Sequence, residues 1–311
     1  MTGLTDRCSH RSEAAHEPLA GTASTIRRWL LIEHAGPWGR DGLLDARLPE
    51  GLGLALRDLG RRTRCRVLLI RRPTRSDGSG TACFAVDTAE AWIGARTLER
   101  VDDAAELDPR DRSAFPLSIR GPVAVVCTHG RRDVCCAERG RPLAAAAALE
   151  HPGSVWESTH VGGDRFAGNL VAFPHGLVFG RVEPARGAEV VGACAQGRIV
   201  LDRYRGRTSH PMPAQAAEVA LRTRSGLDRI DDVRLVAVER TGDVATVRLA
   251  SPGAEALVKV VRNELPPMRL TCASGSEEAA ATWTVESIEV DAPDPSFAQS
   301  PSSQRGTSSS S

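Results

Sequence analysis

The chain has few aromatic residues and almost no lysine. Aromatic residues make up 4% of its 311 residues, with a single tyrosine, so few side chains are available for stacking on nucleic-acid bases. Its 40 basic and 39 acidic residues leave a formal net charge of +1, whereas a dedicated nucleic-acid binder normally carries a clear basic excess. Lys259 is the only lysine, so the other basic residues are arginines. We therefore expect no nucleic-acid partner.

The chain also lacks long hydrophobic runs. Residues 1–21 contain no apolar core of the length that a secretory signal needs. The longest apolar runs, near Trp29 and Pro122, are far shorter than a membrane span. We therefore expect a soluble, cytoplasmic protein with no membrane partner. Thiols are kept reduced in that compartment, so clustered cysteines there indicate metal binding or catalysis more than disulfides.

The order of apolar runs predicts an α/β fold with flexible ends. Residues 1–24 are polar and are expected to be flexible, apart from a short helical stretch. Residues 25–118 have the pattern β-α-β-β and predict an N-terminal α/β domain. Residues 119–200 have the pattern β-α-β-β-β-α, the order of a thioredoxin-like unit. Residues 201–291 predict a smaller β-rich region of one helix and two hairpins, and the serine-rich tail 292–311 predicts disorder.

Two local features of this pattern carry further expectations. The helix that begins near Cys135 contains Gly140 and Pro142, which should kink or restart it. In the C-terminal region we expect one hairpin with its turn at 241–243 and a second hairpin over 268–290.

Two cysteines, a histidine and an aspartate follow two neighbouring predicted strands. Cys127 ends the apolar strand that starts at Pro122, and Cys136 lies nine positions further on, where the helix is expected to begin. His160 ends the next strand, and Asp164 follows it after two glycines. Sites in open α/β sheets gather beyond the carboxyl ends of the strands, so we expect these side chains to converge. Such residue types bind transition metals; the alternative is that both cysteines only fill space in the core.

The segments CTHGRRDVCC and HVGGDRFAGN, which carry these residues, resemble the sucrase/ferredoxin-like family. The resemblance is closest over residues 121–200, and the preceding domain looks like the family's more divergent N-terminal half. It implies a thioredoxin-like ferredoxin domain with one [2Fe-2S] cluster, held by two cysteines on one iron and two histidines on the other. Cys127 and Cys136 match the cysteine pair, and His160 matches the first histidine. Asp164 stands in the place of the second histidine.

Asp164 departs from the family pattern, and this changes the expected redox potential of the cluster. Neutral histidines raise the potential of such clusters, to about −150 to +300 mV in Rieske centres against about −400 mV in plant-type ferredoxins. An aspartate returns one negative charge, so a cluster in this chain should have a lower potential than in two-histidine relatives. Two alternatives stay open: Cys135 or His129 supplies the fourth ligand, or the cluster has been lost.

The expected function is electron transfer with an unknown redox partner protein. The chain is then an electron carrier more than an enzyme with its own substrate. A second hypothesis is a structural zinc module, because the same donors suit a closed Zn²⁺ site. A third is an α/β protein without metal that binds a small molecule in the same crevice.

The remaining cysteines, histidines and arginines are given mainly structural interpretations. Arg131, Arg132 and Arg165 could attract an acidic partner, but solvated loop arginines are the favoured explanation. No Cys-x-x-Cys motif is present, which argues against disulfide exchange. His175 is expected at a hairpin turn. The scattered cysteines are expected to fill the core or lie on the surface: Cys8, Cys65, Cys83, Cys194 and Cys272.

Overall fold

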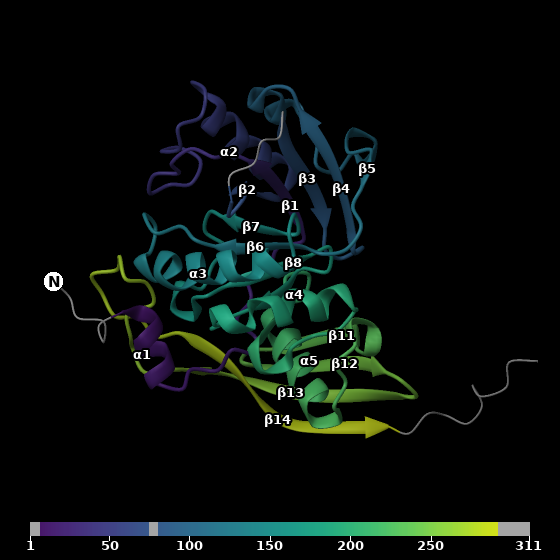
Figure 1. Ribbon diagram of the computed structural model, residues 1–311. Coiled ribbons are helices and arrows are strands. Elements are labelled where there is room, and N and C mark those ends of the chain that lie inside the picture. Colours follow the sequence, from purple (N-terminus) through teal and green to yellow (C-terminus); the bar gives the residue numbers. More distant parts are fainter. Residues whose placement is uncertain (1–6, 75–79, 292–311) are drawn as a thin grey trace, which may run out of the picture.

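The computed structural model describes residues 7–74 and 80–291, which form one large mixed sheet and one small antiparallel sheet with helices packed on them (Figure 1). The α-helices of the described residues are α1 (Cys8–Ala14), α2 (Leu52–Thr63), α3 (Val134–Glu150), α4 (Gly187–Ala195) and α5 (Met212–Ser225). The strands of the large sheet are β1 (Arg28–Glu33), β2 (Cys65–Arg71), β3 (Thr81–Asp87), β4 (Trp92–Leu98), β5 (Leu117–Ser118), β6 (Val123–Cys127), β7 (Val155–Ser158), β8 (Leu170–Phe173), β9 (Leu177–Phe179) and β10 (Tyr204–Arg207). Those of the small sheet are β11 (Arg234–Thr241), β12 (Val244–Ser251), β13 (Ala254–Glu264) and β14 (Ala281–Asp291).

The large sheet repeats one strand arrangement twice. Its order is β10-β9-β8-β6-β7-β2-β1-β3-β4-β5. In the first half β1 is parallel to β2 and antiparallel to β3; in the second half β6 is parallel to β7 and antiparallel to β8. The halves join where the tips of β2 and β7 pair in antiparallel fashion, Ile70 with Ser158 and Arg71 with Glu157. The carboxyl ends of all four parallel strands therefore meet at the centre of the sheet, where sites form in α/β folds.

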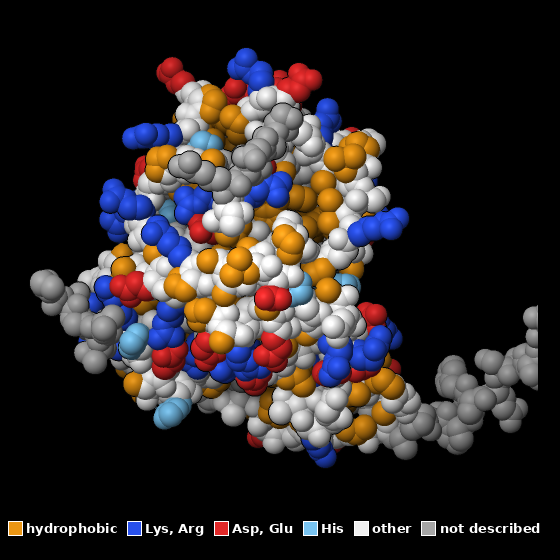
Figure 2. Space-filling model, in the orientation of Figure 1, with side chains coloured by type: hydrophobic (Ala, Val, Ile, Leu, Met, Phe, Trp, Pro, Cys, Tyr) orange, Lys and Arg blue, Asp and Glu red, His pale blue; other side chains and the backbone are white. Residues whose placement is uncertain are grey.

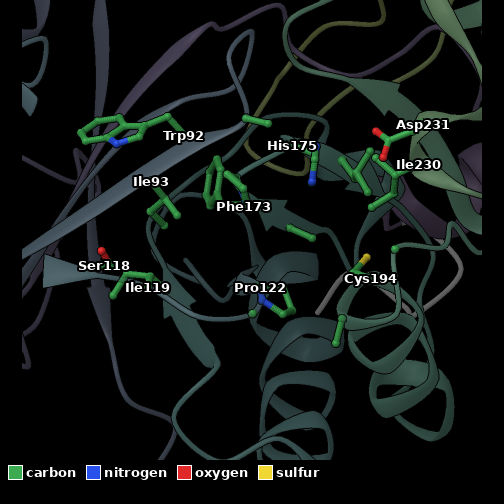
Figure 3. Close-up of a pocket in the computed structure, with 17 residues that line it drawn as sticks. Trp92, Ile93, Ser118, Ile119, Pro122, Phe173, His175, Cys194, Ile230 and Asp231 are labelled. Atoms are coloured by element: carbon green, nitrogen blue, oxygen red, sulfur yellow. The ribbon is translucent and has the colours of Figure 1, made fainter. Parts of the chain in front are cut away.

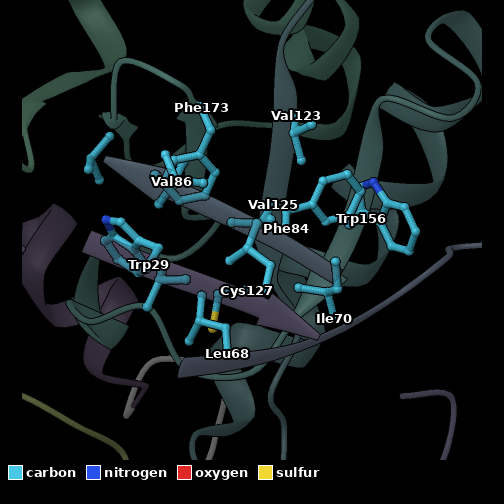
Figure 4. Packing of buried hydrophobic residues seen from close by; sticks show 14 of the residues in the cluster. Trp29, Leu68, Ile70, Phe84, Val86, Val123, Val125, Cys127, Trp156 and Phe173 are labelled. Atoms are coloured by element: carbon cyan, nitrogen blue, oxygen red, sulfur yellow. The ribbon is translucent and has the colours of Figure 1, made fainter. Parts of the chain in front are cut away.

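One hydrophobic core spans the junction between the two halves (Figure 4). Trp29 of the first half packs edge-on against Phe173 of the second, with ring centroids 5.3 Å apart. Phe84 and Trp156 make a similar contact at 5.6 Å. Cys127 belongs to the same cluster. Burying a large apolar side chain contributes about 1.5–3 kcal/mol, so these rings help to hold the two halves of the sheet together.

The C-terminal region is a sheet with one covered face. Helix α5 packs on it through Ala214, Ala217 and Leu221, which contact the buried side of β12 and β13. The predicted turn near residue 242 is confirmed, because Thr241 pairs with Val244 across β11 and β12. The large sheet also continues past residue 200, since β10 pairs with β9; the expected patterns had not assigned this strand.

Helix α3 differs from the expected interrupted helix. It runs from Val134 to Glu150 as one α-helix with Pro142 inside it. Pro142 removes one backbone donor, but Leu143, Ala144 and Ala147 bury against the strands of the second half. Their packing outweighs the local cost of proline, so the helix continues.

The second expected hairpin is wrong. Strand β14 pairs with β13 along its length and not with residues 268–278. In that segment only Met268 forms a bridge, with Glu278. The sequence pattern did not predict β13. This strand occupies the place beside β14 that residues 268–278 were expected to take. Residues between β13 and β14 instead form a loop that carries Cys272 across to helix α1.

Residues 7–24 are packed and not flexible as expected. Helix α1 begins at Cys8, and Ser12 and Glu17 are buried with a hydrogen bond of 2.6 Å between their side chains. Arg165 pairs with Glu17 at 2.7 Å, and Arg181 donates to Ser12. The polar composition was misleading because these polar groups serve as buried partners of arginines. Residues 1–6 and the tail 292–311, for which flexibility and disorder are predicted, lie outside the described residues.

The surface shows no dominant charge on the visible face. Basic and acidic side chains stand beside one another over much of Figure 2, as the net charge of +1 leads one to expect. Within the part of the chain that the structure describes, no helix has the length and apolar character needed to cross a bilayer.

Candidate metal centre

Two loops at the junction of the half-sheets carry the candidate ligands. Strand β6 ends at Cys127, and α3 begins after Asp133, whose carboxylate accepts a hydrogen bond of 2.9 Å from the backbone N–H of Cys135 and so caps the helix. Cys136 lies in the first turn of that helix. On the second loop, Gly162 and Gly163 have φ values of +102° and +77°, which glycine adopts without strain.

The structure brings the four predicted side chains together. Donor atoms of Cys127, Cys136 and His160 lie within 4.8 Å of one another. Oδ1 of Asp164 lies 3.2 Å from Sγ of Cys136 and 2.9 Å from Nδ1 of His160. Both cysteines and Asp164 are buried, whereas the His160 side chain is 26% exposed. His160 is thus the member of the group that faces solvent.

Hydrogen bonds and burial shift the pKa values of three side chains in the group. A hydrogen bond from Cys136 holds the pKa of the Cys127 thiol well below its usual value, with His160 contributing, although burial opposes the shift. The pKa of Cys136 is raised by that same bond and by burial. Burial alone would lower the pKa of His160, but Asp164 and Cys127 outweigh it and raise the pKa to about 9. These shifts favour a thiolate on Cys127 beside a protonated His160, so a metal ion that binds both must displace the imidazole proton.

One ring nitrogen in the group lacks a proper partner. Nδ1 of His160 is buried and makes no aligned hydrogen bond, although Oδ1 of Asp164 lies only 2.9 Å away. A buried ring nitrogen without an aligned partner, beside two thiols and a carboxylate, is arranged as a metal ligand is. Two sulfurs, one imidazole nitrogen and one carboxylate oxygen suit zinc or an iron–sulfur centre. By donor type and burial, the residues fit either group.

The two reserve ligands lie elsewhere. Nε2 of His129 contacts the carbonyl oxygen of Gly39 at 3.0 Å, and its ring packs edge-on against Trp38. His129 therefore ties the first loop to the N-terminal half, and burial lowers its pKa. Cys135 turns to the other side of α3, where its sulfur lies 3.3 Å from that of Cys272. Neither residue is among the three whose donor atoms lie within 4.8 Å of one another around Cys127, although Nδ1 of His129 is also buried without a hydrogen-bond partner.

A cavity of about 270 Å³ opens beside His160. Its charged lining is mainly basic: Arg40, Arg57, Arg66, Arg132 and Asp41. Of the arginines considered from the sequence, Arg132 lines this cavity, whereas Arg165 is paired with Glu17. The exposed edge of the candidate centre thus faces a region of positive charge.

A second cavity, of about 520 Å³, lies at the opposite end of β6 (Figure 3). Pro122, at the amino end of that strand, lines it together with Trp92, Phe173, His175 and Cys194. None of the four candidate ligands lines it. His175 does stand at the β8–β9 turn, as expected.

Sequence reasoning missed a second group of metal-binding residue types. Cys8, Asp133, Cys135 and Cys272 place one donor atom each within 4.8 Å of one another. The sequence interpretation assigned Cys8 and Cys272 to core filling or the surface. They are 264 positions apart and form no spacing motif, so only the folded chain reveals them as neighbours.

Comparison with known proteins identifies related sequences. A family described as Sucrase/ferredoxin-like matches residues 19–206. "Altered inheritance of mitochondria protein 32" of the yeast Meyerozyma guilliermondii is 35% identical over 99 residues, which are 28% of this chain and 35% of the yeast protein. The chain therefore matches only about a third of that relative's length. No solved structure matches at a significant level.

Proposed function

Because this chain belongs to the sucrase/ferredoxin-like family, we propose that residues 119–200 form a thioredoxin-like ferredoxin domain that binds one [2Fe-2S] cluster. Cys127 and Cys136 hold one iron, and His160 and Asp164 hold the other. A cluster bound there supplies a one-electron redox couple, so the chain works as an electron carrier. A cytoplasmic location agrees with the eight cysteines, all of which are unpaired.

The observation that carries this proposal is that donor atoms of Cys127, Cys136 and His160 lie within 4.8 Å of one another, with Oδ1 of Asp164 3.2 Å from Cys136 and 2.9 Å from His160. The sulfurs of Cys127 and Cys136 and the carboxylate of Asp164 are shielded from water, and Nδ1 of His160 has no aligned partner within the protein. A core-filling role for the cysteines does not explain why a histidine and a carboxylate are buried beside them. The strand order β7-β6-β8-β9 with α3 and α4 also agrees with the β-α-β-β-β-α unit expected from the sequence.

The chain's own residues have separable roles in this site. The pKa of Cys127 is lowered, mainly by the hydrogen bond from Cys136, which favours the thiolate form that binds metal. Oδ1 of Asp164 and Nδ1 of His160 lie 2.9 Å apart, close enough to bind one iron together. The exposed edge of His160 adjoins the arginine-lined cavity, which favours a partner protein with an acidic docking surface.

The first prediction concerns loading. Full-length protein expressed with ample iron and purified without oxygen should be red-brown and contain two irons and two sulfides per chain, the composition of a [2Fe-2S] cluster. Cys127→Ala should abolish the colour because it removes a ligand. Cys83→Ala is the matched control, since Cys83 is also fully buried but lies in the core of the N-terminal half. Colourless wild-type protein, or colour retained in Cys127→Ala, would refute the proposal.

The second prediction concerns the unusual ligand. Asp164→His should keep the cluster and raise its midpoint potential, because a neutral imidazole replaces an anionic carboxylate. Asp164→Ala should lose the cluster or hold it weakly. The measurement is redox titration of the visible absorption bands. An unchanged potential in Asp164→His would show that residue 164 does not bind iron.

A zinc ion is the second candidate for the site at Cys127, Cys136 and His160, because their donor atoms lie close together. Donors of three residues within 4.8 Å of one another suit a single tetrahedral ion. The chain would then be an interaction module without redox activity. Stoichiometric zinc in colourless protein, lost in Cys127→Ala, would establish it.

A further inference from the structure

A second donor group joins three distant parts of the chain. Cys8 comes from α1, Asp133 and Cys135 from the start of α3, and Cys272 from the loop between β13 and β14. In Figure 1 this loop, in yellow, lies beside α1 and one end of α3. The thiols are 3.7 Å apart for Cys8 and Cys135, 3.3 Å for Cys135 and Cys272, and 3.5 Å for Cys272 and Cys8.

These separations match a tetrahedral metal site. With Zn–S bonds of about 2.3 Å, sulfurs at the corners of a tetrahedron lie about 3.8 Å apart. The carboxylate of Asp133 completes the fourth corner, with Oδ2 3.7 Å from the sulfur of Cys8. The sulfurs are too far apart for the disulfide bond length of about 2.05 Å. Three thiols also cannot all be paired with one another, so oxidation would leave one unpaired.

Two of the three sulfurs accept hydrogen bonds that favour negative charge. The backbone N–H of Cys8 donates to the sulfur of Cys272 at 3.4 Å, and Ser9 donates its hydroxyl to Cys135 at 3.3 Å. Each oxygen of Asp133 accepts one backbone N–H, from Cys135 at 2.9 Å and from Cys272 at 2.6 Å. Such hydrogen bonds orient metal ligands and leave a lone pair on each oxygen for an ion.

Two arginines offset the charge of the group. Three thiolates and one carboxylate around Zn²⁺ leave a net negative charge. Arg139 pairs with Glu13; this bond is the main cause of its raised pKa, and the nearby sulfurs of Cys135 and Cys8 add to the rise. Arg7, which pairs with Glu138 at 2.7 Å, also attracts the sulfurs of Cys272 and Cys135.

Hydrophobic packing does not explain why these segments meet. The buried apolar cluster there contains only Cys8, Cys135 and Ala167, with Cys272 against it. Free cysteine is a small hydrophobe, and three such side chains beside a buried carboxylate make a weak core. A shared metal ion explains both the carboxylate and the close approach of the sulfurs.

We propose that Cys8, Cys135, Cys272 and Asp133 bind one Zn²⁺ as a closed structural site. All four tetrahedral positions are filled by protein, so the ion has no open position for catalysis. It fastens α1 and the β13–β14 loop to the start of α3. The adjacent Cys136 points to the other side of the same helical turn, toward Cys127, so the zinc also braces the helix end that carries a ligand of the first site.

The test isolates the second site in the full-length chain. With Cys127 and Cys136 both replaced by alanine, reduced, metal-free protein should bind one zinc per chain in the presence of a competing chelator. Adding Cys272→Ala should abolish that binding, because Cys272 is a ligand. Cys194→Ala is the control and should keep one zinc, since Cys194 belongs to neither group. Cobalt(II) in place of zinc should give the intense visible bands of a tetrahedral thiolate site.

A parallel measurement guards against failure of the double variant to fold. In the otherwise wild-type chain, Cys272→Ala should bind one zinc fewer than wild type, whatever occupies the first site. Equal zinc in both proteins would overturn the proposal. So would iron as the sole ion at this site, or a disulfide between two of the three cysteines in protein whose thiols were alkylated at lysis. Iron and sulfide content, measured separately, reports on the first site.

Discussion

Gly140→Ala should destabilise the protein and impair metal binding at the first site, although alanine is the better helix former. Gly140 lies where α3 crosses the end of β6. A Cβ added there would be 2.0 Å from the carbonyl oxygen of Cys127 and 3.1 Å from its carbonyl carbon. Both are backbone atoms, so no side-chain rotation relieves the overlap. The helix must therefore move away from the strand, and this increases the distance between Cys136 on α3 and Cys127 on β6.

The expected size follows from two opposing effects. Alanine favours a helix over glycine by about 1 kcal/mol, while overpacking of this kind costs typically about 1–3 kcal/mol and sometimes more. Because the overlap is with two backbone atoms, we expect the upper part of that range and a net loss of up to about 2 kcal/mol in the free energy of unfolding, measured by urea denaturation, together with reduced metal content. Both readouts are needed, because a stability loss alone would not locate the change at the site.

Gly192→Ala is the matched control. Gly192 lies inside α4, and its added Cβ would have its nearest neighbour, a ring atom of His151, at 3.4 Å. That is an ordinary contact, so this change should be neutral or stabilising by up to about 1 kcal/mol and leave metal content unchanged. If Gly140→Ala behaved like Gly192→Ala, the close packing of α3 on β6 would not be needed to form the site.

The first site was predictable because its residues lie close together along the chain. Cys127 and Cys136 flank one strand-to-helix turn, and His160 and Asp164 follow the neighbouring strand. Parallel pairing of β6 with β7 then brings the two loops together. Strand periodicity and one topological rule were enough for this. Most strands and helices of residues 25–200 were predicted for the same reason, since their apolar patterns are local.

The features that could not be predicted depend on long-range contacts. Strand β14 pairs with β13 and not with residues 268–278. Those residues are therefore left as a loop that crosses to α1, and this loop brings Cys272 to Cys8 and Cys135. The burial of Ser12 and Glu17 depends on Arg165 and Arg181, which are more than 140 positions away. Polarity in a single segment is ambiguous, because solvent and a distant charged partner satisfy a polar group equally well.

The burial of Glu218 also depends on contacts between separate elements, because its fully buried carboxylate is surrounded by cationic side chains. It lies on α5, and its oxygens contact Arg222 at 2.9 Å, Arg207 at 3.0 Å and His210 at 3.2 Å. Arg207 belongs to β10 of the large sheet, and Arg222 also donates to carbonyl oxygens of the segment before β11. This network therefore joins α5, which covers the small sheet, to the large sheet.

The network should make stability sensitive to acid. Burial alone would raise the pKa of Glu218, but Arg207, His210 and Arg222 outweigh it and hold the pKa far below its ordinary value of 4.5. A carboxylate whose pKa is lowered on folding stabilises the native state above its unfolded pKa. That stabilisation is present in full at neutral pH and declines as the pH falls below about 4.5, by at most about 1.4 kcal/mol per pH unit for one proton.

Glu218→Gln should therefore lower the free energy of unfolding at pH 7 by about 3–5 kcal/mol, because it leaves buried guanidinium groups without a counter-charge. The difference between wild type and variant should shrink as the pH falls below 4.5, the ordinary pKa of the carboxyl group. Urea denaturation across this pH range measures both effects. Glu255→Gln is the control, since Glu255 and its partner Arg248 are about half exposed and such pairs contribute about 0–1 kcal/mol. A loss at pH 7 no larger than that of the control, or a difference independent of pH, would show that the Glu218 network does not hold the two sheets together.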